Sequence, residues 1–79
     1  MKSRPVRWQE ACDKIREGLD ELTEIRDEYQ DWMDNLPENL QSGALHEKLE
    51  AVCDIDLDSI DSALSDAEGA ALPLGFGRD

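Results

Sequence analysis

The sequence predicts an all-α fold: one long amphipathic N-terminal helix packed against two short helices, as a helical hairpin or bundle that dimerises. Three observations support this prediction. Apolar residues recur at alternating steps of three and four from Trp8 to Leu36, the spacing of one helix face over about eight turns. Two shorter stretches with helical spacing follow Pro37. A chain of 79 residues buries too small a fraction of its surface to be very stable, so help from a second copy is expected.

The long helix is expected at residues 5–36, after a loose basic arm at residues 1–4. Its apolar seam consists of Trp8, Cys12, Ile15, Leu19, Leu22, Tyr29, Met33 and Leu36, with Arg26 as the interruption. Neighbouring residues widen this seam to the breadth of a core-facing helix, namely Ala11, Gly18, Ile25 and Trp32. Gly18 lowers helix propensity by roughly 1 kcal/mol relative to Ala, and its place beside the seam suggests that something packs closely there.

A turn is expected at residues 37–41, because the residue before a proline is displaced from the helical region and Pro37 lacks a backbone donor. Short helices are expected at residues 42–53 and 56–68, with Ser42 as the N-cap of the first. Each is about 17 Å long against roughly 45 Å for the long helix. Two such helices in series should therefore cover only part of the long one.

An extended tail is expected at residues 69–79. Gly69 is suited to stop a helix, and the sequence that follows is too rich in proline and glycine to be helical and too apolar for a typical disordered end. The candidate docking residues in this tail are Leu72, Leu74 and Phe76. They are expected to dock either on the chain's own core or on a partner, with self-docking through Phe76 the favoured interpretation.

The opposite face of the long helix carries an uninterrupted column of carboxylates. It consists of Glu10, Asp13, Glu17, Asp20, Glu24, Asp27, Asp31 and Asp34. These charges are spaced at roughly 5 Å along the axis, which is of the order of one phosphate strand. With 20 acidic and 8 basic residues and a net charge of −12, the chain is expected to bind a basic protein surface and not nucleic acid directly. The alternative is that the column is only the solvated face of an amphipathic helix.

No catalytic residue, metal or cofactor is predicted, and the chain is not expected to be an enzyme. His46 is the only histidine, and Cys12 and Cys53 have no Cys-x-x-Cys companion, so a zinc site cannot be assembled. Cys53 and His46 lie two helical turns apart, beyond hydrogen-bonding reach. We expect both cysteines to be reduced thiols.

Three alternating aspartates resemble the start of an EF-hand calcium loop, namely Asp54, Asp56 and Asp58. Ser59 stands where that loop needs glycine, and Ser65 stands where it needs a bidentate acid. Helix capping or solvated charge is therefore the favoured interpretation of these aspartates.

The N-terminal sequence indicates a cytoplasmic protein without membrane contact. No apolar run approaches the length that spans a bilayer. The basic start passes into Trp8 and charged residues without a secretory apolar region.

Two segments resemble, in the style of their sequence, the short acidic helical proteins encoded in bacteriophage and prophage genomes. The first runs from Glu28-Tyr29-Gln30-Asp31-Trp32 through Asn35-Leu36-Pro37-Glu38-Asn39-Leu40-Gln41-Ser42, and the second is Leu72-Pro73-Leu74-Gly75-Phe76-Gly77-Arg78-Asp79. The resemblance implies a small accessory or inhibitory protein that occupies a host protein, in the host cell cytoplasm. It implies no catalytic residues.

Two function classes follow. In the first, the protein is a non-enzymatic interaction module, such as an inhibitor or DNA mimic, whose acidic column occupies a basic nucleic-acid-binding surface of a host protein. In the second, it is a structural or adaptor helical dimer that recognises a partner through its apolar seam and its tail, while the acids only keep it soluble.

Overall fold

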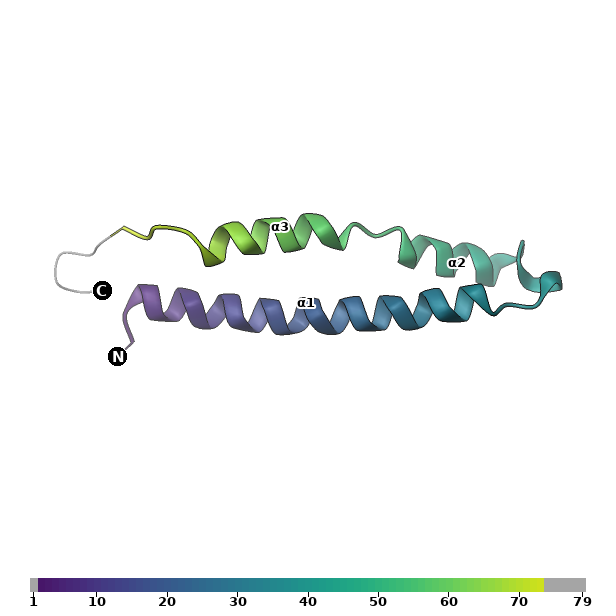
Figure 1. Ribbon diagram of the computed structural model, residues 1–79, viewed down its shortest axis with the longest axis horizontal. Coiled ribbons are helices and arrows are strands. Elements are labelled where there is room, and N and C mark those ends of the chain that lie inside the picture. The colour runs from purple at the N-terminus through teal and green to yellow at the C-terminus, as the bar shows by residue number, and fades with distance from the viewer. Residues whose placement is uncertain (1, 74–79) are drawn as a thin grey trace.

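A computed structural model describes residues 2–73 and has the form of a long helical hairpin (Figure 1). In chain order its elements are α1 (Arg4–Asp34), the 3-10 turn η1 (Glu38–Leu40), α2 (Ala44–Cys53) and α3 (Leu57–Glu68). α1 forms one arm, and α2 and α3 lie end to end in a second arm that returns along it (Figure 1). The prediction of an all-α chain with one long N-terminal helix is confirmed over the described residues.

Local hydrogen bonds set the ends of α1. The Ser3 hydroxyl accepts a bond from the Val6 amide at 3.4 Å, so the helix begins one residue before Pro5. At the other end, the Asn35 side chain donates to the Asp31 carbonyl at 2.7 Å. The helix ends at Asp34, two residues before the predicted end, because Leu36 precedes a proline and leaves the helical region.

The second arm begins differently from the prediction at Ser42. Gly43 takes the N-cap position in an extended conformation, and its carbonyl accepts the Glu47 amide at 3.2 Å without any side-chain cap. The predicted capping role of Ser42 is therefore wrong, since the preceding turn places the helix start one residue further on. α3 does have a side-chain cap, because the Asp56 carboxylate accepts from the Ser59 amide at 3.1 Å.

The buried core is thin and runs along the line where the two arms meet. Cys12 and Leu19 of α1 pack with Leu57 and Leu64 of α3, and each of these side chains is less than 10% exposed. Leu36 and Leu49 are buried as well. The described part of the chain therefore buries few large apolar groups, and the molecule is slender, with extents of 65 × 19 × 15 Å.

The second arm reaches the N-terminal end of α1, which the helix lengths did not predict. The Trp8 indole donates to the carbonyl of Ala67 at 2.8 Å, and the Gln9 amide donates to the carbonyl of Glu68 at 3.4 Å. The link at residues 54–56 is a short turn that keeps α2 and α3 end to end, so the lengths of the two helices add along α1. The second arm thus covers the length of α1, but only one side of it.

None of the helices between residues 2 and 73 combines the length and the apolar content needed to cross a bilayer.

Candidate interaction surfaces

Residues that are seven apart in α1 lie in one column along the helix, which we call a heptad column. The type of residue in each column decides whether that side of the hairpin is apolar or charged. Three adjacent columns are mainly apolar, and the middle residues of these columns are Cys12, Ile15 and Gly18. The column of Cys12 and Leu19 faces the second arm and is the buried one. The two columns that contain Asp13 and Glu17 lie on the other side of the helix. The hairpin therefore has one apolar flank and one acidic flank.

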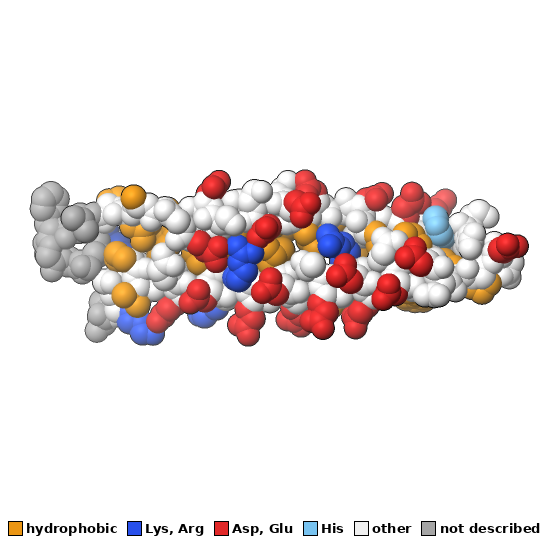
Figure 2. Space-filling view, viewed as in Figure 1, with side chains coloured by type: hydrophobic (Ala, Val, Ile, Leu, Met, Phe, Trp, Pro, Cys, Tyr) orange, Lys and Arg blue, Asp and Glu red, His pale blue; other side chains and the backbone are white. Residues whose placement is uncertain are grey.

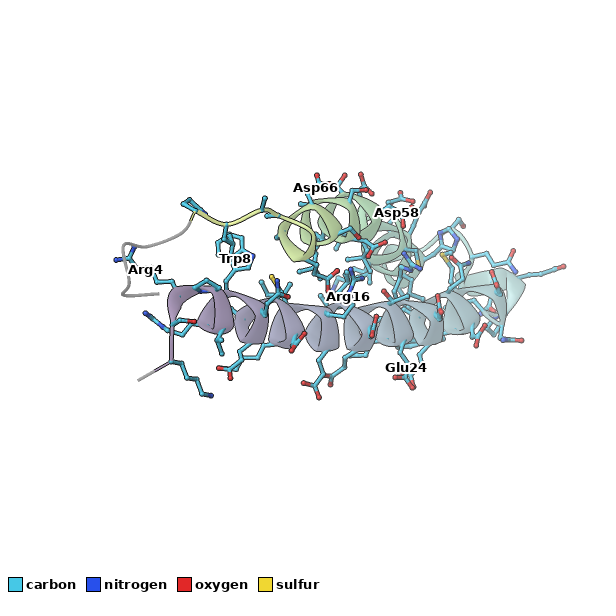
Figure 3. The ribbon with its side chains drawn as sticks, turned by 60° about the vertical axis from the view of Figure 1, so that its left-hand side comes forward. Arg4, Trp8, Arg16, Glu24, Asp58 and Asp66 are labelled. Carbon is cyan, nitrogen blue, oxygen red and sulfur yellow. The ribbon has the colours of Figure 1, made fainter. Side chains whose placement is uncertain are left out.

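We call the predicted carboxylate column of α1 the acidic flank, and the structure places its residues on one outer surface. The exposed members are Asp13, Glu17, Asp20, Glu24, Asp27, Asp31 and Asp34. Glu10 is half-buried and accepts from Lys2 at 2.6 Å. Figure 3 shows Glu24 pointing away from the second arm. A rigid helix thus holds these charges at fixed spacing.

Carboxylates of the second arm add a second row beside the acidic flank. Asp58 and Asp61 of α3 line a shallow pocket together with Asp20 of α1. In Figure 2, acidic side chains (red) lie along both arms of the hairpin, and basic side chains (blue) lie near the boundary between the two arms. Arg16 and Arg26 line the same pocket.

Arg16 is the main polar tie between the two arms. Its guanidinium donates to the Asp61 carboxylate and, at 2.7 Å, to Glu68 Oε1, while a longer bond of 3.4 Å reaches the Ser65 hydroxyl. The hydrogen bond from Arg16 holds the pKa of Glu68 below its usual range. The bonds to Glu68 and then Asp61 raise the pKa of Arg16 further above neutrality. Arg16 is therefore a satisfied structural cation between two acidic rows.

Sequence reasoning missed this role of Arg16. The available signal was its column, which also holds Gln9, Thr23 and Gln30 and lies between the buried column and the acidic flank. A cation at that place is positioned to bridge to whichever arm covers the core. Its acidic partners are 45 and 52 residues away in the chain, so no local spacing could have named them.

The apolar seam, predicted to serve as core or as an oligomer contact, is only partly covered in the single chain. Of its residues, Cys12, Leu19 and Leu36 are buried and Met33 is half-buried. The others are 36 to 51% exposed, namely Trp8, Ile15, Leu22 and Tyr29, together with Trp32 and Ile25 beside the seam. The second arm is one helix wide, so it covers the column of Cys12 and part of the neighbouring column of Ile15. The column of Gly18, which is furthest from the second arm, stays open.

We call the exposed apolar side the apolar flank. It comprises Trp8, Ile15, Leu22, Ile25, Tyr29 and Trp32 of α1, with Ile55, Ile60, Ala63 and Ala67 of the second arm. Two shallow apolar grooves run along it, one beside Ile15 and Ile60 and one beside Leu22 and Ile55. The rings of Tyr29 and Trp32 stack with their centroids 6.2 Å apart.

Gly18 lies open on this flank. A Cβ atom built at Gly18 has no other heavy atom within 4 Å, apart from its own helix backbone and chain neighbours. The expectation that something packs closely there is therefore not met by the described residues of the single chain. The reason is that Gly18 belongs to the apolar column furthest from the second arm.

The first residues of the tail lie beside the start of α1. Leu72 is half-buried and, with Pro73, lines a small pocket against Trp8 and Pro5. Figure 3 shows Trp8 reaching from α1 toward this returning segment. Leu74 and Phe76, the other predicted docking residues, lie outside the described residues.

The candidate chemical groups are dispersed. Cys12 is buried, Cys53 is half-buried, and both are free thiols. His46 lies 3.7 Å from a Glu50 carboxylate oxygen. Across residues 2–73, no three His, Cys, Asp or Glu side chains are grouped so that they could hold a metal ion. Asp56 is engaged as the cap of α3, and its bonds from Ser59 lower the pKa of its carboxyl.

Comparison with protein-family models, with curated proteins and with solved structures finds no match for this chain.

Proposed function

We propose that this protein is a non-enzymatic interaction module whose acidic flank occupies a basic surface of another protein, one that otherwise binds nucleic acid. The observation that carries the proposal is that seven of the eight predicted carboxylates are exposed on one unbroken helix. Such an array attracts a complementary basic surface at long range and repels nucleic acid.

The two-row arrangement also supports this proposal. Asp20 of α1 lines one pocket together with Asp58 and Asp61 of the second arm, so a partner's basic surface can meet carboxylates from both arms. Arg16 is bonded to Asp61 and Glu68, so its positive charge is matched within the hairpin. We further propose that the protein is a phage-type inhibitor acting in the host cell cytoplasm, as the sequence resemblance implies.

Charge reversal tests the proposal. The triple variant Glu17→Lys, Glu24→Lys and Asp31→Lys changes three exposed carboxylates of one heptad column. With a basic DNA-binding protein as the partner, the affinity of the wild-type protein should fall steeply between about 50 and 200 mM NaCl, as expected of an electrostatic contact. Duplex DNA should displace the wild-type protein from this partner, because both would occupy the same basic surface. The triple variant should not bind.

The matched control carries the same change of charge on the second arm. Glu47→Lys, Asp54→Lys and Asp66→Lys alter three exposed acids outside the acidic flank, and Figure 3 shows Asp66 on the side away from α1. This control should retain most of the affinity. Equal loss in both variants would mean that only net charge matters, and salt-independent binding would exclude the acidic flank as the site.

A second function is favoured by the apolar flank. In it, the protein is an adaptor homodimer that recognises its partner through apolar surface and the tail, with the acids providing solubility. Truncation after Gly69 should then abolish partner binding, while the triple charge reversal on α1 should leave it intact. The two proposals therefore predict opposite results for the same pair of variants.

A further inference from the structure

We propose that two copies of this chain pair through the apolar flank as an antiparallel homodimer, with the two-fold axis passing close to Gly18. This inference rests on the dimerisation proposed above and adds the face, the direction and the register of the contact. The second copy is the occupant that the surface itself specifies, for four reasons: area, the sizes of the opposed side chains, charge and the open glycine.

The area of the apolar flank matches what a stable dimer requires. Six large apolar side chains of α1 are 36 to 51% exposed on it, and Ile55 and Ile60 add surface at 56% and 41%. With about 200 Å² for a large apolar side chain, the flank presents on the order of 700 Å², near the about 800 Å² per partner of a standard interface. This area of the apolar flank is slightly larger than the largest apolar patch on a typical monomer, which is about 300–600 Å².

Side-chain size along the open column of α1 favours an antiparallel partner. From the N-terminal end, the column reads Arg4, Ala11, Gly18, Ile25 and Trp32. If the two-fold axis passes at Gly18, a residue on the N-terminal side of Gly18 in one copy faces the partner's residue that lies equally far on the C-terminal side. Ala11 then faces the partner's Ile25, so small residues meet large ones. In a parallel pair, Trp32 would meet its own copy while the alanines left a gap.

Charge favours the same direction. The basic residues Arg4 and Arg7 are at one end of α1, and Glu28 lies at the other, in the same heptad column as Arg7. An antiparallel pair brings each basic end to the partner's acidic end, and it places Arg4 beside the partner's Trp32, where a guanidinium can stack on an indole. A parallel pair would instead put like charges together at both ends.

Gly18 gives a reason for the position of the axis. Among residues 2–73 nothing packs on it, yet a glycine inside a helix is destabilising by roughly 1 kcal/mol relative to Ala. At the centre of an antiparallel pair, the absence of a side chain lets the two α1 backbones approach closely. The same axis brings Ile60, which lies with Ile15 along one groove of the flank, toward the partner's Ile60. The acidic flanks of both copies face outward.

Analytical ultracentrifugation of the full chain tests whether the apolar flank is the dimer contact. The wild-type protein should dimerise with a measurable dissociation constant. Ile25→Glu should raise that constant at least about a hundredfold, because the dimer would bury a carboxylate without a partner. The matched control Ser62→Glu adds the same charge at an exposed position of α3 outside the flank and should leave the constant unchanged. Circular dichroism should find Ile25→Glu as helical as the wild type.

Disulfide cross-linking tests the direction and the register, with Cys53→Ser as background and Cys12 buried. Gly18→Cys should form a covalent dimer under mild oxidation, since the two Cα atoms at the axis lie within reach of a disulfide. Ala11→Cys should not, because its copies would be about 21 Å apart along the antiparallel helices.

The outcomes separate the levels of the proposal. A wild-type protein that stays monomeric at all concentrations overturns dimerisation and this inference together. A dimer that Ile25→Glu leaves intact overturns the face. Cross-linking of both Gly18→Cys and Ala11→Cys would indicate a parallel dimer, and cross-linking of neither would indicate another register. Either result overturns this inference, although the protein would still be a dimer. Loss of partner binding by charge reversal is independent of all of these results.

Discussion

The indole of Trp8 donates a hydrogen bond to the carbonyl oxygen of Ala67, with 2.8 Å between nitrogen and oxygen. This bond joins the second turn of α1 to the last turn of α3, where helix carbonyls lack intrahelical partners. Trp8 therefore fastens the open end of the hairpin, although 42% of its surface stays exposed. The aromatic side chain serves both as a cap for α3 and as one end of the apolar flank.

Replacing Trp8 by phenylalanine should loosen this end. Trp8→Phe keeps an aromatic ring and removes the donor, so we expect a loss of about 1 kcal/mol in the free energy of unfolding. Urea denaturation at concentrations below dimerisation measures it. The control Trp32→Phe, at a residue with a similar exposed fraction of 49%, should cost less. An unchanged urea midpoint in Trp8→Phe would show that the bond adds nothing to stability.

Neighbouring leucines of α1 should differ sharply when truncated. Leu19 is 5% exposed and Leu22 is 51% exposed. Leu19→Ala should therefore cost about 2–4 kcal/mol in the dilute monomer, and Leu22→Ala should cost well under half as much. Urea unfolding monitored by circular dichroism checks this pair. Equal losses would mean that the second arm covers a different column of α1.

The bond between Glu68 and Arg16 should make stability depend on pH. The pKa of Glu68 is lowered from 4.5 in the folded state. Its contribution to stability is therefore present above that value and is lost as the pH falls through the folded pKa. Glu68→Gln should lower the urea midpoint at pH 7, and the difference from wild type should vanish in acid.

Glu24→Gln is the control for that experiment, since it removes the same charge on the outer side of α1. It should not lower the midpoint at neutral pH. A difference between wild type and Glu68→Gln that persists in acid strong enough to protonate the carboxylates of the folded protein would contradict the assignment of the effect to Glu68.

Salt should stabilise the folded chain. A net charge of −12 on a slender hairpin repels itself, and counterions screen this repulsion, with a Debye length of about 10 Å at 0.1 M. The melting temperature should rise between 10 and 300 mM NaCl, a range over which screening lengths fall from roughly 30 Å to less than about 8 Å. The triple charge reversal on α1 should respond less. A melting temperature that falls with salt would mean that the ion pairs between the arms outweigh the repulsion.

Gly18→Ala should stabilise the dilute monomer by about 1 kcal/mol, because the added methyl group meets nothing within 4 Å and alanine has the higher helix propensity. Thermal unfolding at low concentration measures this gain. At concentrations where the dimer forms, the same variant should lose part of the advantage, since a side chain then stands between the two α1 backbones. A destabilised dilute monomer would contradict the open position of Gly18.

The length and continuity of α1 could be predicted from the sequence, because its apolar seam, interrupted only at Arg26, and its acidic column both continue almost to Pro37. The side on which the acidic flank lies was predictable for the same reason. The spacing of Glu17 and Glu24 places both on one helix face whatever the rest of the chain does.

The coverage of the apolar seam could not be predicted from the sequence. Three adjacent columns of α1 are mainly apolar, and periodicity cannot say which of them a second arm will cover. That choice is fixed by distant contacts such as Arg16 with Glu68 and Trp8 with Ala67, which join residues more than 50 positions apart. The cap at Gly43 was missed for a local reason, since backbone conformation in the turn displaced Ser42.

The hairpin brings residues 2 and 73 to one tip, while the corner after Pro37 forms the other (Figure 1). A reporter or a surface tether attached at the shared tip would therefore leave both long sides of the rod bare. Held in this way, the molecule projects by up to its full 65 Å, and its contacts can be measured one side at a time.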